Sequence, residues 1–111
     1  MARKAHQRFL GSPTSTNFND LAMECFQAVN FSISLMERTA QEKQLGMATS
    51  YGELVELLEK DSFLTSQQGK KLRRLVRLRN LISHEYFNIN RQELLEMYKL
   101  LGAVRSLFTR I

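Results

Sequence analysis

Residues 65–86 read TSQQGKKLRRLVRLRNLISHEY, and this stretch decides the fold. Its leucines recur at intervals of three, followed by Leu81 and Ile82, a spacing that lines one side of an α-helix. The opening Thr65-Ser66-Gln67-Gln68 is typical of a helix start, because a side-chain oxygen can cap backbone N–H groups while a later glutamine reaches back. We therefore predict a helix from this cap to the region of His84.

Three further segments show the same periodicity. Residues 18–45 are predicted as a long helix, preceded by a segment rich in glycine, serine, threonine and proline that favours turns and caps. A shorter helix is predicted from Ser50, with Glu53 completing its cap, and a last helix from Asn90, with Glu93 in the same role. The predicted buried stripes are Ala22, Phe26, Val29, Ile33, Met36 and Ala40; Leu54, Val55, Leu57 and Leu58; Leu72, Leu75, Val76, Leu78, Leu81 and Ile82; and Leu94, Met97, Tyr98, Leu101, Val104 and Phe108.

No stretch alternates apolar and polar residues as a strand would, so the sequence predicts an all-α fold. Short connections favour a bundle in which successive helices are mostly antiparallel. With 111 residues the chain has the length of one domain. We expect residues 1–17 to form an N-terminal segment, either a short helix or disordered, and residues 18–111 to form the helical bundle.

The composition is that of a globular protein with a positive charge. The formal net charge is +5, which favours an anionic partner such as nucleic acid without demanding one. No run approaches the roughly 20 apolar residues that span a bilayer, and no signal-peptide pattern is seen, so we expect a cytoplasmic protein without a membrane partner. Cys25 is the only cysteine, which favours simple core packing over a disulfide or a cysteine-based metal site.

Four chemically capable side chains lie within eight residues at the end of the 65–86 pattern: Arg79, Asn80, His84 and Tyr86. Arg79 continues the leucine stripe, so its stem should face the protein. Asn80 and His84 are four residues apart and therefore adjacent on a helix surface, where the amide could orient the imidazole or share a ligand with it. If the helix continues to Tyr86, that residue points in nearly the same direction from the helix axis as Arg79, because the two are seven residues apart.

The spacing Arg79, four residues, His84, one residue, Tyr86 resembles the Arg-x4-His-x-Tyr signature of HepT-type proteins in the HEPN superfamily. The resemblance extends over residues 18–108 and implies an all-α, HEPN-type antiparallel bundle of four main helices. A departure lies in residues 1–10, which are shorter than the family's N-terminal helix.

The resemblance further implies a metal-independent endoribonuclease, possessing no cofactor, whose substrate is RNA and whose site forms between the protomers of a homodimer or higher homo-oligomer. In that reading Arg79, His84 and Asn80 are catalytic. The chemistry is consistent, because His84 can transfer protons near neutral pH and Arg79 can offer two donors to phosphate oxygens. Asn80 would position the phosphate or the imidazole.

Tyr86 takes a separate role in the same resemblance. In HepT-type toxins the tyrosine is the residue to which a cognate minimal nucleotidyltransferase antitoxin attaches AMP. Such a modification would place a bulky negative group where the RNA phosphate must lie.

A basic run precedes the signature on the same helix. Lys70, Arg73, Arg74 and Arg77 are close together at spacings of three and four, and could follow the RNA backbone. Such a run is equally compatible with a solvated helix face.

Two other hypotheses fit the same residues. A related HEPN branch carries the same arginine, asparagine, histidine and tyrosine in a non-catalytic, nucleotide-binding module that docks on a partner nucleotidyltransferase. Alternatively the chain is a structural oligomerisation domain in which the signature residues merely tie helices together. Other chemistries lack their motifs, since the sequence contains no glycine-rich phosphate loop, no metal-ligand spacing and no serine or cysteine nucleophile pattern.

Overall fold

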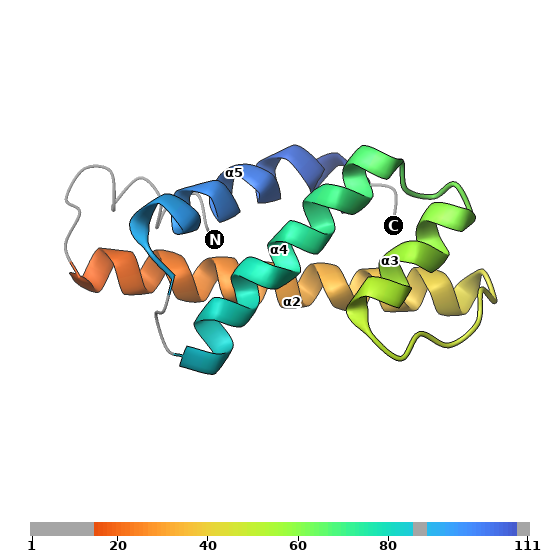
Figure 1. The fold of residues 1–111 in the computed structure, drawn as a ribbon, viewed down its shortest axis with the longest axis horizontal. Coiled ribbons are helices and arrows are strands. Elements are labelled where there is room, and N and C mark those ends of the chain that lie inside the picture. Colours follow the sequence, from red (N-terminus) through yellow and green to blue (C-terminus); the bar gives the residue numbers. More distant parts are fainter. Residues whose placement is uncertain (1–14, 86–88, 109–111) are drawn as a thin grey trace.

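The computed structural model describes residues 15–85 and 89–108; for residues 15, 16, 83–85, 106 and 108 it describes the helix path alone. The described chain forms four helices: α2 (Ser15–Glu42), α3 (Tyr51–Lys60), α4 (Ser66–Glu85) and α5 (Arg91–Phe108). Neither described range contains a strand. The all-α prediction is therefore confirmed (Figure 1).

Two of the predicted caps form reciprocal hydrogen bonds. At the start of α4 the backbone N–H of Gln68 donates to Thr65 Oγ1 at 3.1 Å, and the N–H of Thr65 donates to Gln68 Oε1 at 2.8 Å. At the start of α5 the N–H of Glu93 donates to Asn90 Oδ1 at 2.8 Å, and the N–H of Asn90 donates to Glu93 Oε1 at 3.0 Å. Each pair of residues forms a capping box, in which the two side chains accept hydrogen bonds from backbone donors that have no partner within the helix.

The cap of α3 differs in one detail. Ser50 Oγ accepts from the N–H of Glu53 at 3.1 Å, as predicted. The Glu53 carboxylate, however, accepts from both the N–H and the hydroxyl of Thr49, at 2.8 and 2.7 Å. These bonds lower the pKa of Glu53.

Helix α2 ends before residue 45 because Gln44 takes a left-handed conformation with φ of 56°. The N–H of Leu45 then donates to the carbonyl of Ala40 at 3.0 Å, which is the hydrogen bond of a Schellman motif. Helix α3 ends in the same way at Ser62, where φ is 65°. Neither position is a glycine.

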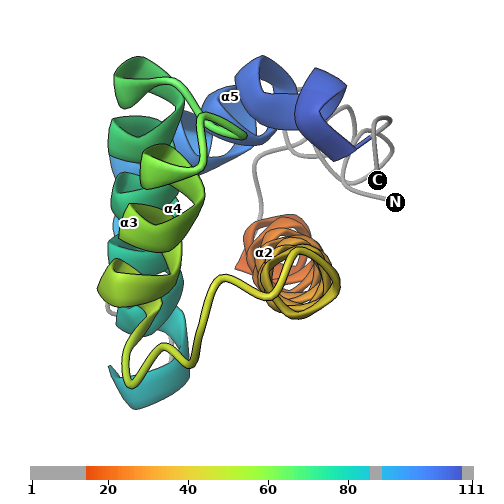
Figure 2. The ribbon, with the colours of Figure 1, turned by 90° about the vertical axis from the view of Figure 1, so that its right-hand side faces the viewer.

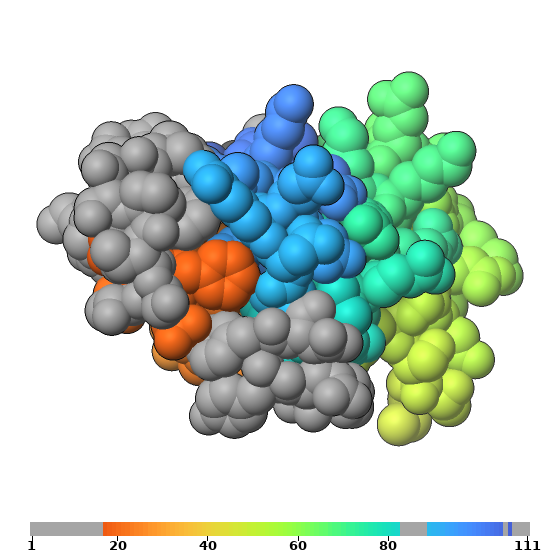
Figure 3. Space-filling model, turned by 60° about the vertical axis from the view of Figure 1, so that its left-hand side comes forward, coloured from red at the N-terminus to blue at the C-terminus, as the bar shows by residue number. Residues whose placement is uncertain are grey.

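Helices α2 and α4 each pack against all three of the other helices. α4 crosses α2 obliquely and runs opposite to both α3 and α5 (Figure 1). The connection 43–50 turns back along the end of α2, so α3 points in the same general direction as α2. Figure 2 looks along α2 and shows α3 and α4 side by side, with α5 above. At the other end of the molecule the first turns of α5 lie beside the start of α2 (Figure 3).

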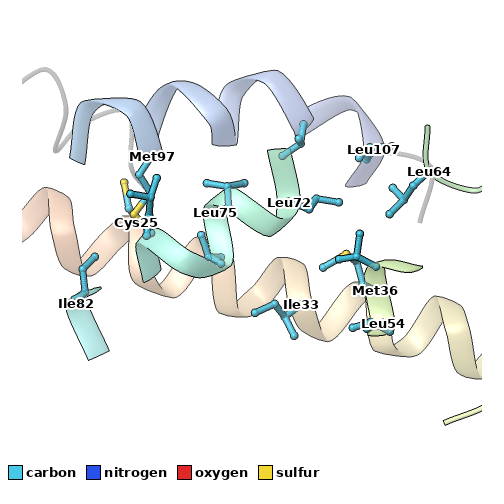
Figure 4. Packing of buried hydrophobic residues seen from close by; sticks show 14 of the residues in the cluster. Cys25, Ile33, Met36, Leu54, Leu64, Leu72, Leu75, Ile82, Met97 and Leu107 are labelled. Atoms are coloured by element: carbon cyan, nitrogen blue, oxygen red, sulfur yellow. The ribbon is translucent and has the colours of Figure 1, made fainter. Parts of the chain in front are cut away.

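One continuous core joins the helices. Leu72 and Leu75 of α4 lie between α5 and α2, and Cys25 packs near Met97 (Figure 4). Most predicted stripe positions are buried, and the side chain of Phe108 lies outside the described part of the chain. The positions that are only partly covered are Phe26, Leu57, Val76, Leu81, Tyr98 and Leu101. Cys25 is a free, fully buried thiol, as the sequence predicted.

None of the described helices is both long and apolar enough to cross a bilayer. The prediction for residues 1–17 lies almost wholly outside the described ranges and stays a prediction.

Candidate active site

The Arg79 guanidinium is held by groups from three helices. Its Nη1 donates to Asn30 Oδ1 on α2 at 2.8 Å, while Nη2 and Nε donate to Asn80 Oδ1 at 2.7 and 3.2 Å. The guanidinium also lies over the ring of Tyr51, the first residue of α3, with Cζ 4.8 Å from the ring centroid. The prediction that the Arg79 stem faces the protein is confirmed, because the residue is half-buried against α2 and α3.

Among the described residues, every group that holds Arg79 is neutral. Two amide oxygens and an aromatic ring fix its orientation, and no carboxylate of the described residues forms an ion pair with it. A structural arginine that is tied to a carboxylate has its charge compensated, whereas no described residue compensates the charge of this guanidinium. A half-buried, oriented and uncompensated cation is suited to binding an anion with two donors.

Asn80 and His84 lie on one unbroken helix, since α4 extends to Glu85. Their four-residue separation therefore places them on the same side of α4. The side chain of His84 lies outside the described part of the chain. Tyr86 lies outside the described residues altogether, so its predicted place near the Arg79 azimuth stays a prediction.

The four predicted RNA-binding cations fall into two groups. Arg73 binds Glu59 of α3 through two nitrogens, at 2.6 and 3.3 Å, and Arg74 binds Glu96 of α5 at 2.8 and 2.9 Å. The hydrogen bond from Arg74 lowers the pKa of Glu96, and the bond to Glu59 raises the pKa of Arg73. These two arginines therefore join α4 to its neighbours.

Lys70 and Arg77 form the other group. Both side chains are exposed, and neither has an ion pair with any described residue. They are seven residues apart, and His84 follows after seven more. Because two helical turns span about seven residues, the three positions share one stripe of α4 at intervals of about 10 Å.

Two cavities share Tyr51 as a wall. The larger, of about 770 Å³, lies between the end of α2 and residues 46–54 and includes Glu37, whose charge disfavours phosphate. The smaller is a groove of about 210 Å³ between the start of α3 and the middle of α4, and it includes Arg77 and Asn80. The groove is thus the cavity with the better electrostatic match to a nucleotide.

Sequence reasoning missed Asn30 and Tyr51. Asn30 has a faint signal, because it lies next to Val29 and three residues before Ile33 and so interrupts the apolar side of α2. Tyr51 has no signal in the chain itself, since its contact with Arg79 depends on how α3 packs on α4.

No group of three or more histidine, cysteine, aspartate or glutamate side chains suited to a metal ion is found within the described residues. The arginine site itself presents amide oxygens and a guanidinium. Its chemistry is that of anion binding.

Comparison with known proteins gives one match. The family model described as Ribonuclease HepT-like matches residues 8–102, which include all of α2, α3 and α4 and most of α5. No curated protein and no solved structure matched the chain. A match over this length, together with the all-helical bundle and the oriented arginine of the Arg-x4-His-x-Tyr motif, means that the chain belongs to the HepT-like ribonuclease family of the HEPN superfamily.

Proposed function

We propose that this protein is a metal-independent endoribonuclease of the toxin class, with Arg79, Asn80 and His84 at its active site. The observation that carries the proposal is the Arg79 guanidinium, which three neutral groups orient and no described carboxylate neutralises. Family membership supports the same reaction class.

The reaction would be an in-line transfer within the RNA strand. The 2′-oxygen forms a bond to the adjacent phosphorus as the bond from phosphorus to the 5′-oxygen breaks, which yields a 2′,3′-cyclic phosphate and a 5′-hydroxyl. A base removes the 2′-hydroxyl proton and an acid protonates the leaving oxygen. Arg79 would bind the non-bridging oxygens, where negative charge builds in the transition state.

His84 is suited to the proton transfers, because an imidazole titrates near neutral pH. The signature contains one histidine, whereas the reaction needs both a base and an acid. A two-fold homodimer would bring a second His84 to the same cleft, and a higher oligomer could repeat that arrangement. The neutral Asn80 amide accepts hydrogen bonds from Arg79. It would hold the guanidinium of Arg79 and the imidazole of His84 in a fixed relative position along α4.

Regulation by a cognate nucleotidyltransferase antitoxin is part of the proposal. The Tyr86 phenol oxygen would attack the α-phosphorus of ATP, with pyrophosphate as the leaving group, and carry AMP thereafter. Because Tyr86 follows His84 by two residues, the added phosphate would compete with RNA for the Arg79 guanidinium.

The test compares wild-type protein with His84→Ala on total RNA and purified tRNA in excess chelator. The mass of each protein is measured to establish the dimer and the absence of AMP on Tyr86. Cleavage by the wild type alone, with cyclic phosphate ends, is the expected result. If neither protein cleaves although both are folded, dimeric and unmodified, the nuclease proposal fails and the docking module on a nucleotidyltransferase becomes the better reading.

A further inference from the structure

The groove between α3 and α4 has the features of a nucleotide subsite. The partly buried Val76 gives it an apolar floor above the fully buried Val55, and Gly52 contributes no side chain. Tyr51 forms one wall and is 42% exposed. Aromatic and apolar surfaces of this kind stack on the faces of RNA bases without selecting one sequence.

The rim of the groove carries an exposed cation that has no ion pair with a described residue. Arg77 is exposed and forms no ion pair with a described residue, whereas the other rim arginine, Arg73, is bonded to Glu59. Asn80 adds an amide to the rim. The groove therefore combines a stacking surface with one uncompensated positive charge, which is the complement of a base and its phosphate.

The groove is also continuous with the arginine site. Tyr51 borders the groove and stacks on Arg79, and Asn80 borders the groove and accepts hydrogen bonds from Arg79. Its cation, Arg77, lies on the stripe of α4 that leads from His84 to Lys70. A strand whose phosphate lies at Arg79 would thus pass directly into the groove.

We propose that this groove binds the RNA nucleotide next to the scissile phosphate, with its base against Tyr51 and its phosphate at Arg77. The inference rests on the proposed ribonuclease function and deepens it by assigning a substrate subsite. It gives Tyr51 two roles, since the same ring supports the Arg79 guanidinium and receives the base. Lys70 would contact the strand further along α4.

Gly52 allows the groove to be filled without removing any of its side chains. A Cβ at Gly52 would meet only Ser50 Oγ, at 3.8 Å, so a side chain can be added there without a clash at its first atom. Because Gly52 lines the groove, we expect a larger side chain at this position to occupy part of it. Gly52→Leu is the test variant, and Gly52→Ala is its matched control. Gly102→Leu is a second control, because Gly102 has equally open surroundings on α5 and borders neither cavity.

The probe is a short fluorescent 2′-O-methyl RNA strand, which cannot be cleaved, and binding is measured by anisotropy. We expect Gly52→Leu to weaken binding about tenfold, the effect of losing one stacked base. Gly52→Ala and Gly102→Leu should bind as the wild type does. With cleavable RNA, Gly52→Leu should raise KM more than it lowers kcat. Arg77→Gln, which leaves the helices intact, should weaken binding of the same strand.

Failure of the inference and failure of the nuclease proposal give different results. A wild type that cleaves RNA, with a folded Gly52→Leu that binds and cleaves equally well, overturns the subsite alone. A wild type that binds the strand but never cleaves, with Gly52→Leu impaired, supports the subsite and overturns the nuclease. Equal loss in Gly102→Leu, or AMP alone binding as tightly as the strand, also overturns the RNA subsite.

Discussion

At the residue scale, the central feature is that Arg79 is oriented while no described carboxylate neutralises it. Substitutions of Asn30 test this feature directly, because Asn30 Oδ1 accepts a hydrogen bond from Arg79 Nη1 at 2.8 Å. Asn30→Ala removes one neutral support and should lower the cleavage rate about tenfold, the effect of losing one positioning contact. Asn30→Asp keeps the shape but adds a carboxylate that can pair with Arg79, so the loss should be larger, about 100-fold.

The measurement is single-turnover cleavage, with circular dichroism and unfolding midpoints as controls. Equal rates for the alanine and aspartate variants would mean that the charge state of Arg79 does not govern the reaction. The RNA affinity also distinguishes the two variants. Asn30→Asp should bind RNA more weakly than Asn30→Ala, because only the aspartate competes with phosphate for the Arg79 guanidinium.

Cys25 offers a second prediction at this scale. Burial, and to a lesser degree the charge of Glu24, raise the pKa of its thiol to about 12. The thiolate is therefore almost absent near neutral pH, and alkylation by iodoacetamide should be negligible in the folded protein. The reaction should accelerate strongly in denaturant. Rapid alkylation of the native protein would show that the core around Cys25 opens easily.

The direction of the Arg79 side chain was predictable from the sequence, whereas the residues that contact it were not. The inward direction of the Arg79 stem follows from helical spacing, which is local. Asn30 and Tyr51 could not be assigned to the site, because their contacts with Arg79 depend on the packing of α2 and α3 against α4. The ion pairs of Arg73 and Arg74 were missed for the same reason.

At the element scale, the starts of α3, α4 and α5 were predictable from their caps, and the end of α4 near His84 was predicted as well, whereas the prediction for α2 ran to residue 45 instead of Glu42. The caps at Thr65 and Asn90 involve residues within a few positions, so sequence alone determines them. The ends at Gln44 and Ser62 place non-glycine residues at positive φ, which local preference disfavours. Tertiary packing of the flanking helices has to supply the compensating free energy.

Gln44 therefore gives a stability prediction. Gln44→Gly should relieve the strain at φ of 56° and raise the free energy of unfolding by up to about 1 kcal/mol. Gln44→Ala, which has the same conformational restriction, is the control and should not stabilise. The measurement is a urea unfolding curve for each protein. Equal or lower stability of the glycine variant would show that the Gln44 side chain makes a compensating contribution.

At the scale of the whole molecule, the ion pair of Arg74 with Glu96 joins α4 to α5 beside the core. The folded pKa of Glu96 lies below its ordinary value of 4.5, so the pair stabilises the protein above that pH and its contribution is lost as the pH falls. The exposed position limits that contribution to less than about 1 kcal/mol.

The stability difference between the wild type and Glu96→Gln should accordingly shrink when unfolding is measured in increasingly acidic buffer. A difference that is the same at neutral and acid pH would exclude Glu96 as the titrating group. Because Arg74 is committed to this pair, the double variant Arg74→Gln/Glu96→Gln should bind RNA much as the wild type does.

The bundle leaves Lys70 and Arg77 exposed on one stripe of α4 without an ion pair to a described residue, and it places the paired Arg73 and Arg74 at the junctions of α4 with α3 and α5. Family membership and the all-helical fold were both predictable, since they depend on the signature and on apolar periodicity. The division of the basic run into structural and free cations required the tertiary structure.

The most direct test is the single-turnover cleavage rate of Arg79→Lys against the wild type, in excess chelator and with matched folding and dimer mass. Lysine keeps the charge but cannot donate to Asn30 and Asn80 while stacking on Tyr51, so it cannot present an oriented pair of donors to phosphate. If an oriented guanidinium drives cleavage, Arg79→Lys should fold and its single-turnover cleavage rate should fall about 100-fold or more. A folded Arg79→Lys protein that cleaves at the wild-type rate would contradict this claim.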